Sequence, residues 1–211
     1  MYTRSNFKVN VTPQFRMLSD DQIAELHQGT LEVMRRTGVQ VEEPAAIDIF
    51  AKAGCWVDDK RVRFPTHLVE WAIAVTPPRV VLCSRLGRPA MALQGERAYF
   101  GTGTDTPNVV DPYSGERRLA TKQDVANISR VVDALPHYSF VSSSGIASDV
   151  SASVSDVHHF EAMVSNTVKP ILFTAWSLDN LKDIIEMAEV VAGGPEALQR
   201  NPFCCLLYTS P

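Results

Sequence analysis

One short stretch near the middle of the chain has residues that could bind a small ligand. The stretch Phe100–Pro107, FGTGTDTP, contains Gly101, Gly103 and Asp105. A dinucleotide-binding loop would need G-x-G-x-x-G opening directly into a helix, and the next helical pattern starts much later. We therefore interpret the glycines as a strand-end turn or as room for a ligand to approach the backbone. Asp105 could pair with a cationic ligand, take a proton, or cap a nearby amide.

Other candidate residues follow later apolar runs. Trp176 ends the run ILFTAW, where its ring could bind a quaternary ammonium by cation–π contact or simply pack. Asp156 starts a helical pattern and is expected to serve the helix N-terminus. His158 and His159 are adjacent, so they diverge on a helix, and we expect no metal site there. Serines 142–144 could line a polar pocket, but no G-x-S-x-G motif surrounds them, and no residue is assigned a catalytic role.

Composition excludes several classes of protein. The chain has 211 residues, is 45% hydrophobic and 21% charged, and carries a net charge of −4. Without a Lys/Arg block it is not expected to bind nucleic acid or an anionic membrane. No signal peptide and no membrane-spanning apolar run is present, so we expect a cytoplasmic protein. The four cysteines lack C-x-x-C spacing and are expected to be free, buried thiols.

Two regions with different patterns must position these residues. Residues 1–95 read as helices and β-hairpins: Ser19 and Gln22 form a capping box, Pro44 begins a second helix, Thr66 caps a third, and hairpins turn at Asp59-Lys60 and near Gly87. Residues 96–211 alternate apolar strands with amphipathic helices, one of them capped by Thr121, which indicates parallel β/α units. The fold class is α/β: a partial TIM (β/α) barrel, with about four of its eight strands, after an α+β region.

The strands of the second region finish in small polar residues, GTGTD, SSSGIASD, TAWS and YTSP. In parallel β/α folds the carboxyl ends of the strands form the functional face. The last run, residues 203–208, looks like an interior strand without a covering helix. Because an unpaired apolar edge promotes aggregation, we expect the chain to be the N-terminal part of a longer one.

The order of these segments resembles a known family. Residues 18–85, 100–141 and 165–177, in this order, are similar to the trimethylamine methyltransferase family, which includes the glycine betaine methyltransferases. The resemblance covers the chain from about Leu18 to Pro211. It implies a TIM barrel with a helical and hairpin N-terminal elaboration. Members move a methyl group from a small tertiary or quaternary amine to the cobalt of a separate corrinoid protein.

The resemblance therefore implies that the chain binds no cofactor directly and that its partners are a methylated amine and a corrinoid protein. Asp105, Gly101 and Gly103 would border the substrate cavity, with Trp176 as an aromatic wall. The trimethylamine enzymes of the family carry pyrrolysine in the later half of the barrel, beyond Pro211, so the chain does not show which type it belongs to. A betaine-like quaternary amine is the preferred substrate class, because the family contains more members without pyrrolysine. The oligomeric state stays open, a homo-oligomer included.

Two alternatives remain at this point. The first is another TIM-barrel enzyme, a lyase or aldolase. Such an enzyme would require a lysine or a His/carboxylate cluster at the end of a strand, and the four predicted strand ends contain neither. A truncated remnant without activity is the second alternative, and the isolated 211-residue chain is expected to be inactive.

Overall fold

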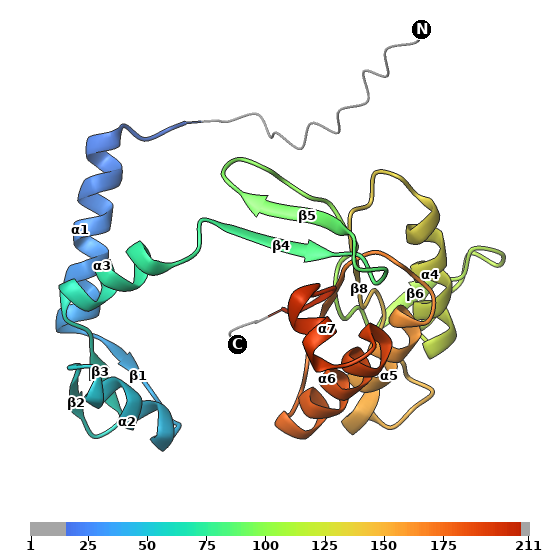
Figure 1. Cartoon of the computed structure of the whole chain (residues 1–211). Coiled ribbons are helices and arrows are strands. Elements are labelled where there is room, and N and C mark those ends of the chain that lie inside the picture. The colour runs from blue at the N-terminus through green and yellow to red at the C-terminus, as the bar shows by residue number, and fades with distance from the viewer. Residues whose placement is uncertain (1–15, 208–211) are drawn as a thin grey trace, which may run out of the picture. The chain divides into compact units, whose positions relative to one another are not determined.

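The computed structural model describes residues 16–207, which divide into two compact units (Figure 1). Residues 16–78 form the N-terminal unit and residues 79–207 the C-terminal unit. The sequence pattern placed the division at residue 95, whereas the two units of the structure divide between residues 78 and 79. The difference arises because the hairpin at residues 79–94 is bonded to the second unit. The Cys83 amide donates to the Pro202 carbonyl at 2.7 Å, and the Arg85 amide donates to the Val168 carbonyl at 2.8 Å.

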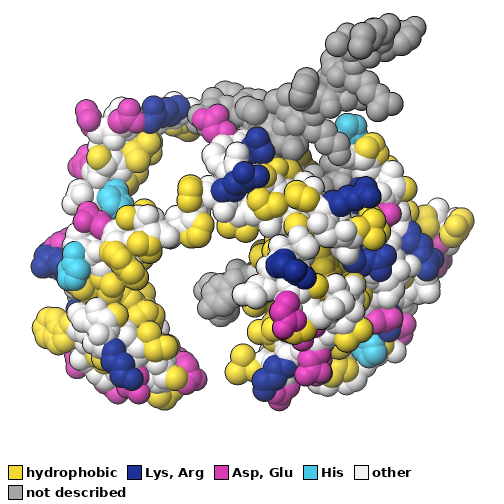
Figure 2. Space-filling view, in the orientation of Figure 1, with side chains coloured by type: hydrophobic (Ala, Val, Ile, Leu, Met, Phe, Trp, Pro, Cys, Tyr) yellow, Lys and Arg dark blue, Asp and Glu magenta, His cyan; other side chains and the backbone are white. Residues whose placement is uncertain are grey.

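The N-terminal unit combines three helices with a small antiparallel sheet. The helices are α1 (Asp20–Arg36), α2 (Pro44–Lys52) and α3 (Thr66–Val75). The sheet has the order β1–β3–β2, from β1 (Val39–Gln40), β2 (Trp56–Asp58) and β3 (Arg61–Arg63). The hairpin predicted at Asp59-Lys60 is confirmed. Few apolar side chains are buried here, chiefly Leu31, Cys55 and Val62, and many hydrophobic side chains of this unit lie at the surface (Figure 2).

The helix starts of this unit follow local sequence signals in two of three cases. The Ser19 hydroxyl accepts from the Gln22 amide, and the Gln22 side chain accepts from the Ser19 amide, which confirms the capping box. Pro44 is the first residue of α2, as predicted. The prediction that Thr66 caps α3 is wrong: Pro65 is the N-cap, Thr66 lies inside the helix, and no side chain bonds the free amides.

The C-terminal unit begins with two antiparallel hairpins. The first pairs β4 (Arg79–Cys83) with β5 (Pro89–Gln94) and confirms the turn predicted near Gly87. The second pairs β6 (Asn108–Val110) with β7 (Arg117–Leu119). The sequence pattern predicted no strand in this segment, because strands of three residues are too short to show an alternating pattern.

Parallel β/α units form the rest of this unit. They are α4 (Lys122–Ala134), β8 (Val141–Ser142), a 3₁₀ turn (Ala152–Val154) leading into α5 (Ser155–Val164), β9 (Ile171–Phe173), α6 (Leu178–Ala192), the short α7 (Pro195–Arg200) and β10 (Cys204–Leu206). The sheet order β10–β9–β8 follows the chain, and both pairings are parallel. Helix α7 was not predicted. Among the free cysteines, Cys205 is exposed, contrary to expectation, because strand residues alternate between faces.

The main core lies between this sheet and helices α4, α5 and α6. The Phe160 and Phe173 rings meet edge to face with centroids 5.4 Å apart. Each large apolar side chain that becomes fully buried contributes roughly 1.5–3 kcal/mol. The largest members, all at most 5% exposed, are Val125, Val132, Val141, Phe160, Met163, Ile171, Phe173, Ile184 and Phe203.

The first strand predicted in the second region, at residues 98–102, is the main departure from the expected fold. It is reduced to a single parallel bridge between Gly101 and Phe140. The Thr102 hydroxyl replaces the backbone ladder beyond that bridge: it accepts from the Ser142 amide at 2.7 Å and donates to the Ser142 carbonyl at 2.9 Å. The described residues thus form a mixed α/β structure, and residues 16–207 contain no closed barrel.

Candidate functional site

Asp105 lies where β8 ends. Its amide donates to the Ser143 carbonyl at 2.6 Å, one residue beyond the strand. Its backbone has φ of +52°, in the left-handed region. That conformation costs a residue other than glycine on the order of 1 kcal/mol. Asp59, in the turn between β2 and β3, has the same φ, and aspartate enters this region more readily than most residues, so the conformation is that of a turn.

Two hydroxyl groups orient the Asp105 carboxylate. Ser143 Oγ donates to Oδ1 at 2.6 Å, and Thr174 Oγ1 donates to Oδ2 at 3.0 Å. Ser143 follows β8 and Thr174 follows β9, so both donors lie at the carboxyl edge of the parallel sheet. Each carboxylate oxygen keeps further acceptor capacity, because an ionised carboxylate offers about four acceptor sites.

The charge of Asp105 is not balanced by a basic side chain. Among residues 16–207, no lysine or arginine forms an ion pair with this carboxylate. Asp105 is half-buried. The group combines fixed orientation, negative charge and partial exposure, which suits it to bind a cation.

The two glycines of the opening stretch differ in their surroundings. A Cβ on Gly101 would lie 2.3 Å from the Phe140 ring, so this position needs glycine for close packing within the chain. A Cβ on Gly103 would meet nothing within 4 Å. The space at Gly101 is thus filled by Phe140, whereas the backbone at Gly103 stays open on that side.

Trp176 lies beyond the same edge of the sheet, two residues after Thr174. Its side chain is 50% exposed. Its amide donates to Asp156 Oδ2 at 2.8 Å, which anchors the loop that follows β9. The exposed ring is free to contact a ligand, whereas its backbone is fixed.

Helix α5 supports this edge with buried polar side chains. Asp156 is 1% exposed, and its Oδ1 accepts from the Val157 amide at 3.0 Å and from Asn180 Nδ2 at 2.8 Å. Asp156 therefore serves the first turn of α5, as expected, and also binds the loop after β9. With three donors around it and almost no exposed surface, Asp156 is a structural carboxylate.

His159 is buried on the same helix. Its Nε2 accepts from the Ala147 amide at 2.8 Å, and its Nδ1 has no hydrogen-bond partner among the described residues. Burial lowers the pKa of this imidazole, and the nearby Asp105 and Asp156 carboxylates oppose that change. His158 diverges from it as predicted, and its Nδ1 lies 3.1 Å from Lys122 Nζ.

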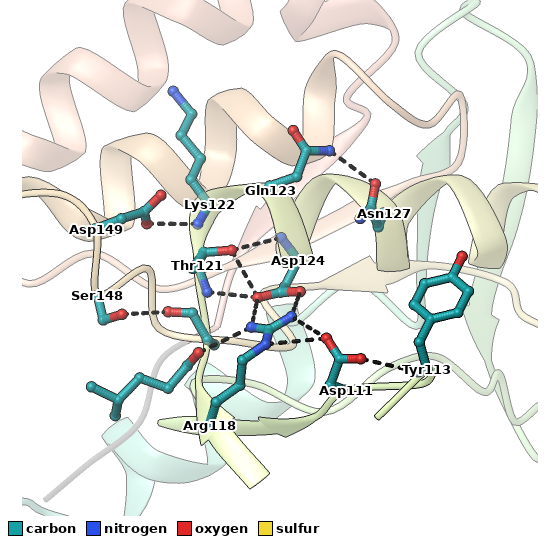
Figure 3. A network of polar contacts seen from close by, with 12 residues as sticks. Asp111, Tyr113, Arg118, Thr121, Lys122, Gln123, Asp124, Asn127, Ser148 and Asp149 are labelled. Atoms are coloured by element: carbon teal, nitrogen blue, oxygen red, sulfur yellow. Dashed lines mark hydrogen bonds and ion pairs between the residues drawn. The ribbon is translucent and has the colours of Figure 1, made fainter. Parts of the chain in front are cut away.

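A second group of carboxylates holds the β6–β7 hairpin to α4 (Figure 3). Arg118 bonds Asp124 at 2.6 and 2.9 Å and Asp111 at 3.2 and 3.3 Å. Asp124 also accepts from the Thr121 amide and hydroxyl, both at 2.8 Å, which confirms the Thr121 capping box. Arg118 holds the pKa of Asp124 well below its usual range, the Thr121 bonds act in the same direction, and burial opposes them.

The sequence indicated Asp105 but not its partners. Thr102 and Thr174 were not singled out, and Ser143 was noted only as one of three serines that end a strand. The usable signal was the small polar residues after each apolar run. Which hydroxyl meets which carboxylate depends on strand register, which the sequence alone does not reveal.

Two further observations bound the chemistry of the described part. Residues 16–207 contain no group of three or more His, Cys, Asp and Glu side chains that could hold a metal ion. No helix in the same range is long and apolar enough to cross a membrane.

With this geometry in view, the chain can be compared with known proteins. The sequence profile of the family described as "Trimethylamine methyltransferase (MTTB)" matches residues 2–211. The chain belongs to the trimethylamine methyltransferase family. The resemblance seen in the order of sequence segments is thereby confirmed.

Curated relatives agree with this family. The chain is 36% identical over 197 residues to the trimethylamine methyltransferase MttB of Desulfitobacterium hafniense strain DSM 10664 / DCB-2, covering 92% of this chain and 40% of that protein. It is 24% identical over 201 residues to the glycine betaine methyltransferase of Desulfitobacterium hafniense strain Y51, covering 94% and 41%. It is 28% identical over 212 residues to MttB2 of Methanosarcina mazei, covering 94% and 42%. The chain thus spans about 40% of the length of these relatives.

Proposed function

We propose that the protein containing this chain transfers a methyl group from a small methylated amine to the cobalt of a corrinoid held by a partner protein. Family membership supports the class of reaction, since relatives are named trimethylamine and glycine betaine methyltransferases. The substrate is a tertiary or quaternary amine, and a betaine-like quaternary amine is preferred. Both kinds carry a positive charge on nitrogen near neutral pH, and a betaine carries a carboxylate as well.

The observation that carries this proposal is the unbalanced carboxylate of Asp105. Ser143 and Thr174 hold it in one orientation before any ligand arrives. Opposite charges about 4 Å apart gain roughly 4 kcal/mol at an effective dielectric constant of about 20, before the cost of desolvation. A methylated ammonium has the charge and the size to use this position, and the exposed Trp176 ring would add a cation–π contact.

The work of the chain in this reaction is to bind and orient the amine. The corrinoid cobalt, when its protein is docked, supplies the nucleophile that accepts the methyl group. Asp105 would hold the ammonium nitrogen so that one methyl group points away from the carboxylate, towards the partner. Fixed orientation of this kind lowers the barrier by positioning rather than by covalent catalysis.

The proposal includes a (β/α) barrel as the scaffold. Three parallel strands and the Gly101–Phe140 bridge follow one another in chain order, with helices between them. The same succession of strands and helices builds a TIM barrel, in which active sites lie at the carboxyl ends of the strands. Asp105, Ser143 and Thr174 all belong to that edge in the described part of the chain.

The test uses the complete gene product that contains this chain, with a panel including trimethylamine and glycine betaine. Consumption of cob(I)alamin, followed by absorbance, measures the transfer. The Asp105→Asn variant is expected to lower kcat/KM at least tenfold, which corresponds to about 1.4 kcal/mol. Its melting temperature should be unchanged or higher, because asparagine adopts positive φ more easily than most residues.

Asp179→Asn is the matched control, since Asp179 is 89% exposed on α6 and, among residues 16–207, forms an ion pair with Lys182 alone. It should leave both turnover and stability unchanged. If no methylated amine supports transfer by the unmodified protein, the proposed function is wrong. If transfer occurs and Asp105→Asn turns over normally, Asp105 does not bind the amine.

A further inference from the structure

The loop between β8 and α5, residues 143–148, carries one of the two donors to Asp105 and is bonded on three sides. At its end, the Ser148 amide and hydroxyl both donate to the Ala120 carbonyl, at 2.9 and 2.8 Å. On the first side, Ser143 accepts from the Asp105 amide, and the Ile146 amide donates to the Thr106 carbonyl at 2.9 Å. Thr106 also donates its hydroxyl to the Ser144 carbonyl. The position of this loop therefore decides where Ser143 Oγ meets the Asp105 carboxylate.

On the second side, His159 holds the loop. Its Nε2 is the acceptor for the Ala147 amide at 2.8 Å, and both residues are at most 2% exposed. The loop has little freedom to adjust, because a Cβ added to Gly145 would lie 2.8 Å from Ala120 Cβ. If His159 stopped accepting, the Ala147 amide would be left buried and unpaired, which typically costs about 1–3 kcal/mol.

Only the neutral imidazole can make this bond. An amide donor requires a lone pair on Nε2, which assigns the ring proton to Nδ1. Protonation at Nε2 would set two N–H donors against each other. The charged or titratable groups acting on this ring are Asp105 from the segment before β6, and Asp156 and His158 from α5 itself.

We propose that His159 is a positioning residue for the amine site: the neutral ring fixes the 143–148 loop, and with it Ser143 against Asp105, whereas proton uptake at Nε2 releases the loop and weakens amine binding. The inference rests on the proposed function for its ligand. On this proposal, the affinity for the amine depends on pH through His159, although the residues that contact the amine do not themselves change protonation.

The sign of the effect follows from the direction of the pKa change. Burial lowers the pKa of His159 below its ordinary value of about 6.5. Its contribution is therefore fully present above about pH 6.5 and is lost as the pH falls through the lowered pKa of the folded protein. Amine affinity should be constant from about pH 8 to pH 7 and decline in mild acid.

Two substitutions at His159 distinguish the role of Nε2 from that of Nδ1. His159→Gln places an amide oxygen near the Nε2 position, where it can accept from Ala147 and cannot take a proton. His159→Asn reaches only as far as Nδ1 and loses that acceptor. Amine dissociation constants are measured by calorimetry on the complete protein, with glycine betaine and trimethylamine, at about pH 8 and pH 5.5. His158→Gln is the matched control on the adjacent residue.

The unmodified protein and His158→Gln should lose affinity severalfold in acid. His159→Gln should keep the neutral-pH affinity at both pH values, and His159→Asn should bind weakly at both. An acid decline in His159→Gln equal to that of the unmodified protein overturns the proposal. Full affinity in His159→Asn would overturn it as well.

A second measurement does not depend on the amine. Hydrogen exchange of the unmodified protein, followed by mass spectrometry and corrected for intrinsic rates, should show peptides over residues 143–148 losing protection in acid while α6 keeps it. Equal protection of this loop at both pH values overturns the proposal, even if His159→Gln fails to fold. If no amine binds at any pH, the proposed function fails, and the exchange experiment still decides the role of His159.

Discussion

Two carboxylates of the C-terminal unit share one kind of support and differ in one partner. Both accept hydrogen bonds from hydroxyl groups. Asp124 accepts one from Thr121, and Asp105 accepts one from Ser143 and one from Thr174. Arg118 then neutralises Asp124, whereas no lysine or arginine in residues 16–207 pairs with Asp105. A carboxylate that is oriented but not neutralised within the described chain is the one suited to an external cation.

The backbone supports the same distinction. Asp124 lies in the first turn of α4, where an acidic side chain is favoured. Asp105 has a positive φ, a region that aspartate enters more readily than most residues other than glycine and asparagine. The structural carboxylate thus lies in a helix, and the candidate binding carboxylate lies in a left-handed loop position. Each prediction below changes one member of this comparison.

The largest effect is expected from removing the hydroxyl donors of Asp105. The Ser143→Ala and Thr174→Val double variant should weaken amine binding about tenfold, because the carboxylate loses its fixed orientation. Calorimetric titration with glycine betaine measures this change. Ser114→Ala, in the exposed turn of the β6–β7 hairpin, is the control and should bind normally. Normal binding by the double variant would mean that the hydroxyls do not matter for orientation.

A smaller effect, on stability alone, is expected at Asp124. Asp124→Asn removes the ion pair with Arg118 and weakens the capping box of α4, which should cost about 1 kcal/mol of unfolding free energy. Denaturant unfolding measures this loss, and amine affinity should not change. Asp105→Asn should show the reverse pattern. A stability loss in Asp105→Asn as large as that in Asp124→Asn would break the comparison.

The smallest effect is expected in strong acid. Arg118 holds the pKa of Asp124 below its ordinary value of about 3.9. The stabilisation is present above that value and is lost as the pH falls through the lowered pKa of the folded protein. Melting curves below about pH 4 should therefore decline less steeply for Asp124→Asn than for the unmodified protein. Identical slopes would show that Arg118 does not stabilise the ionised form.

Helix starts were predictable because their signals are local. The caps at Ser19 and Thr121 act on amides three residues away, so short motifs reveal them. Apolar runs between helices indicated the parallel strands, and the small polar residues after them indicated the functional edge. The β6–β7 hairpin and α7 were missed because elements of three and six residues carry too little pattern.

The sequence by itself determined the family, the alternation of strands and helices, and the presence of Asp105 among small polar residues after an apolar run. Only the tertiary structure decided what surrounds that carboxylate. Its hydroxyl donors come from 38 and 69 residues further along the chain. The acceptor that fixes their loop is a histidine on the following helix, twelve residues beyond Ala147. Such contacts depend on strand register and helix packing, which no local spacing encodes.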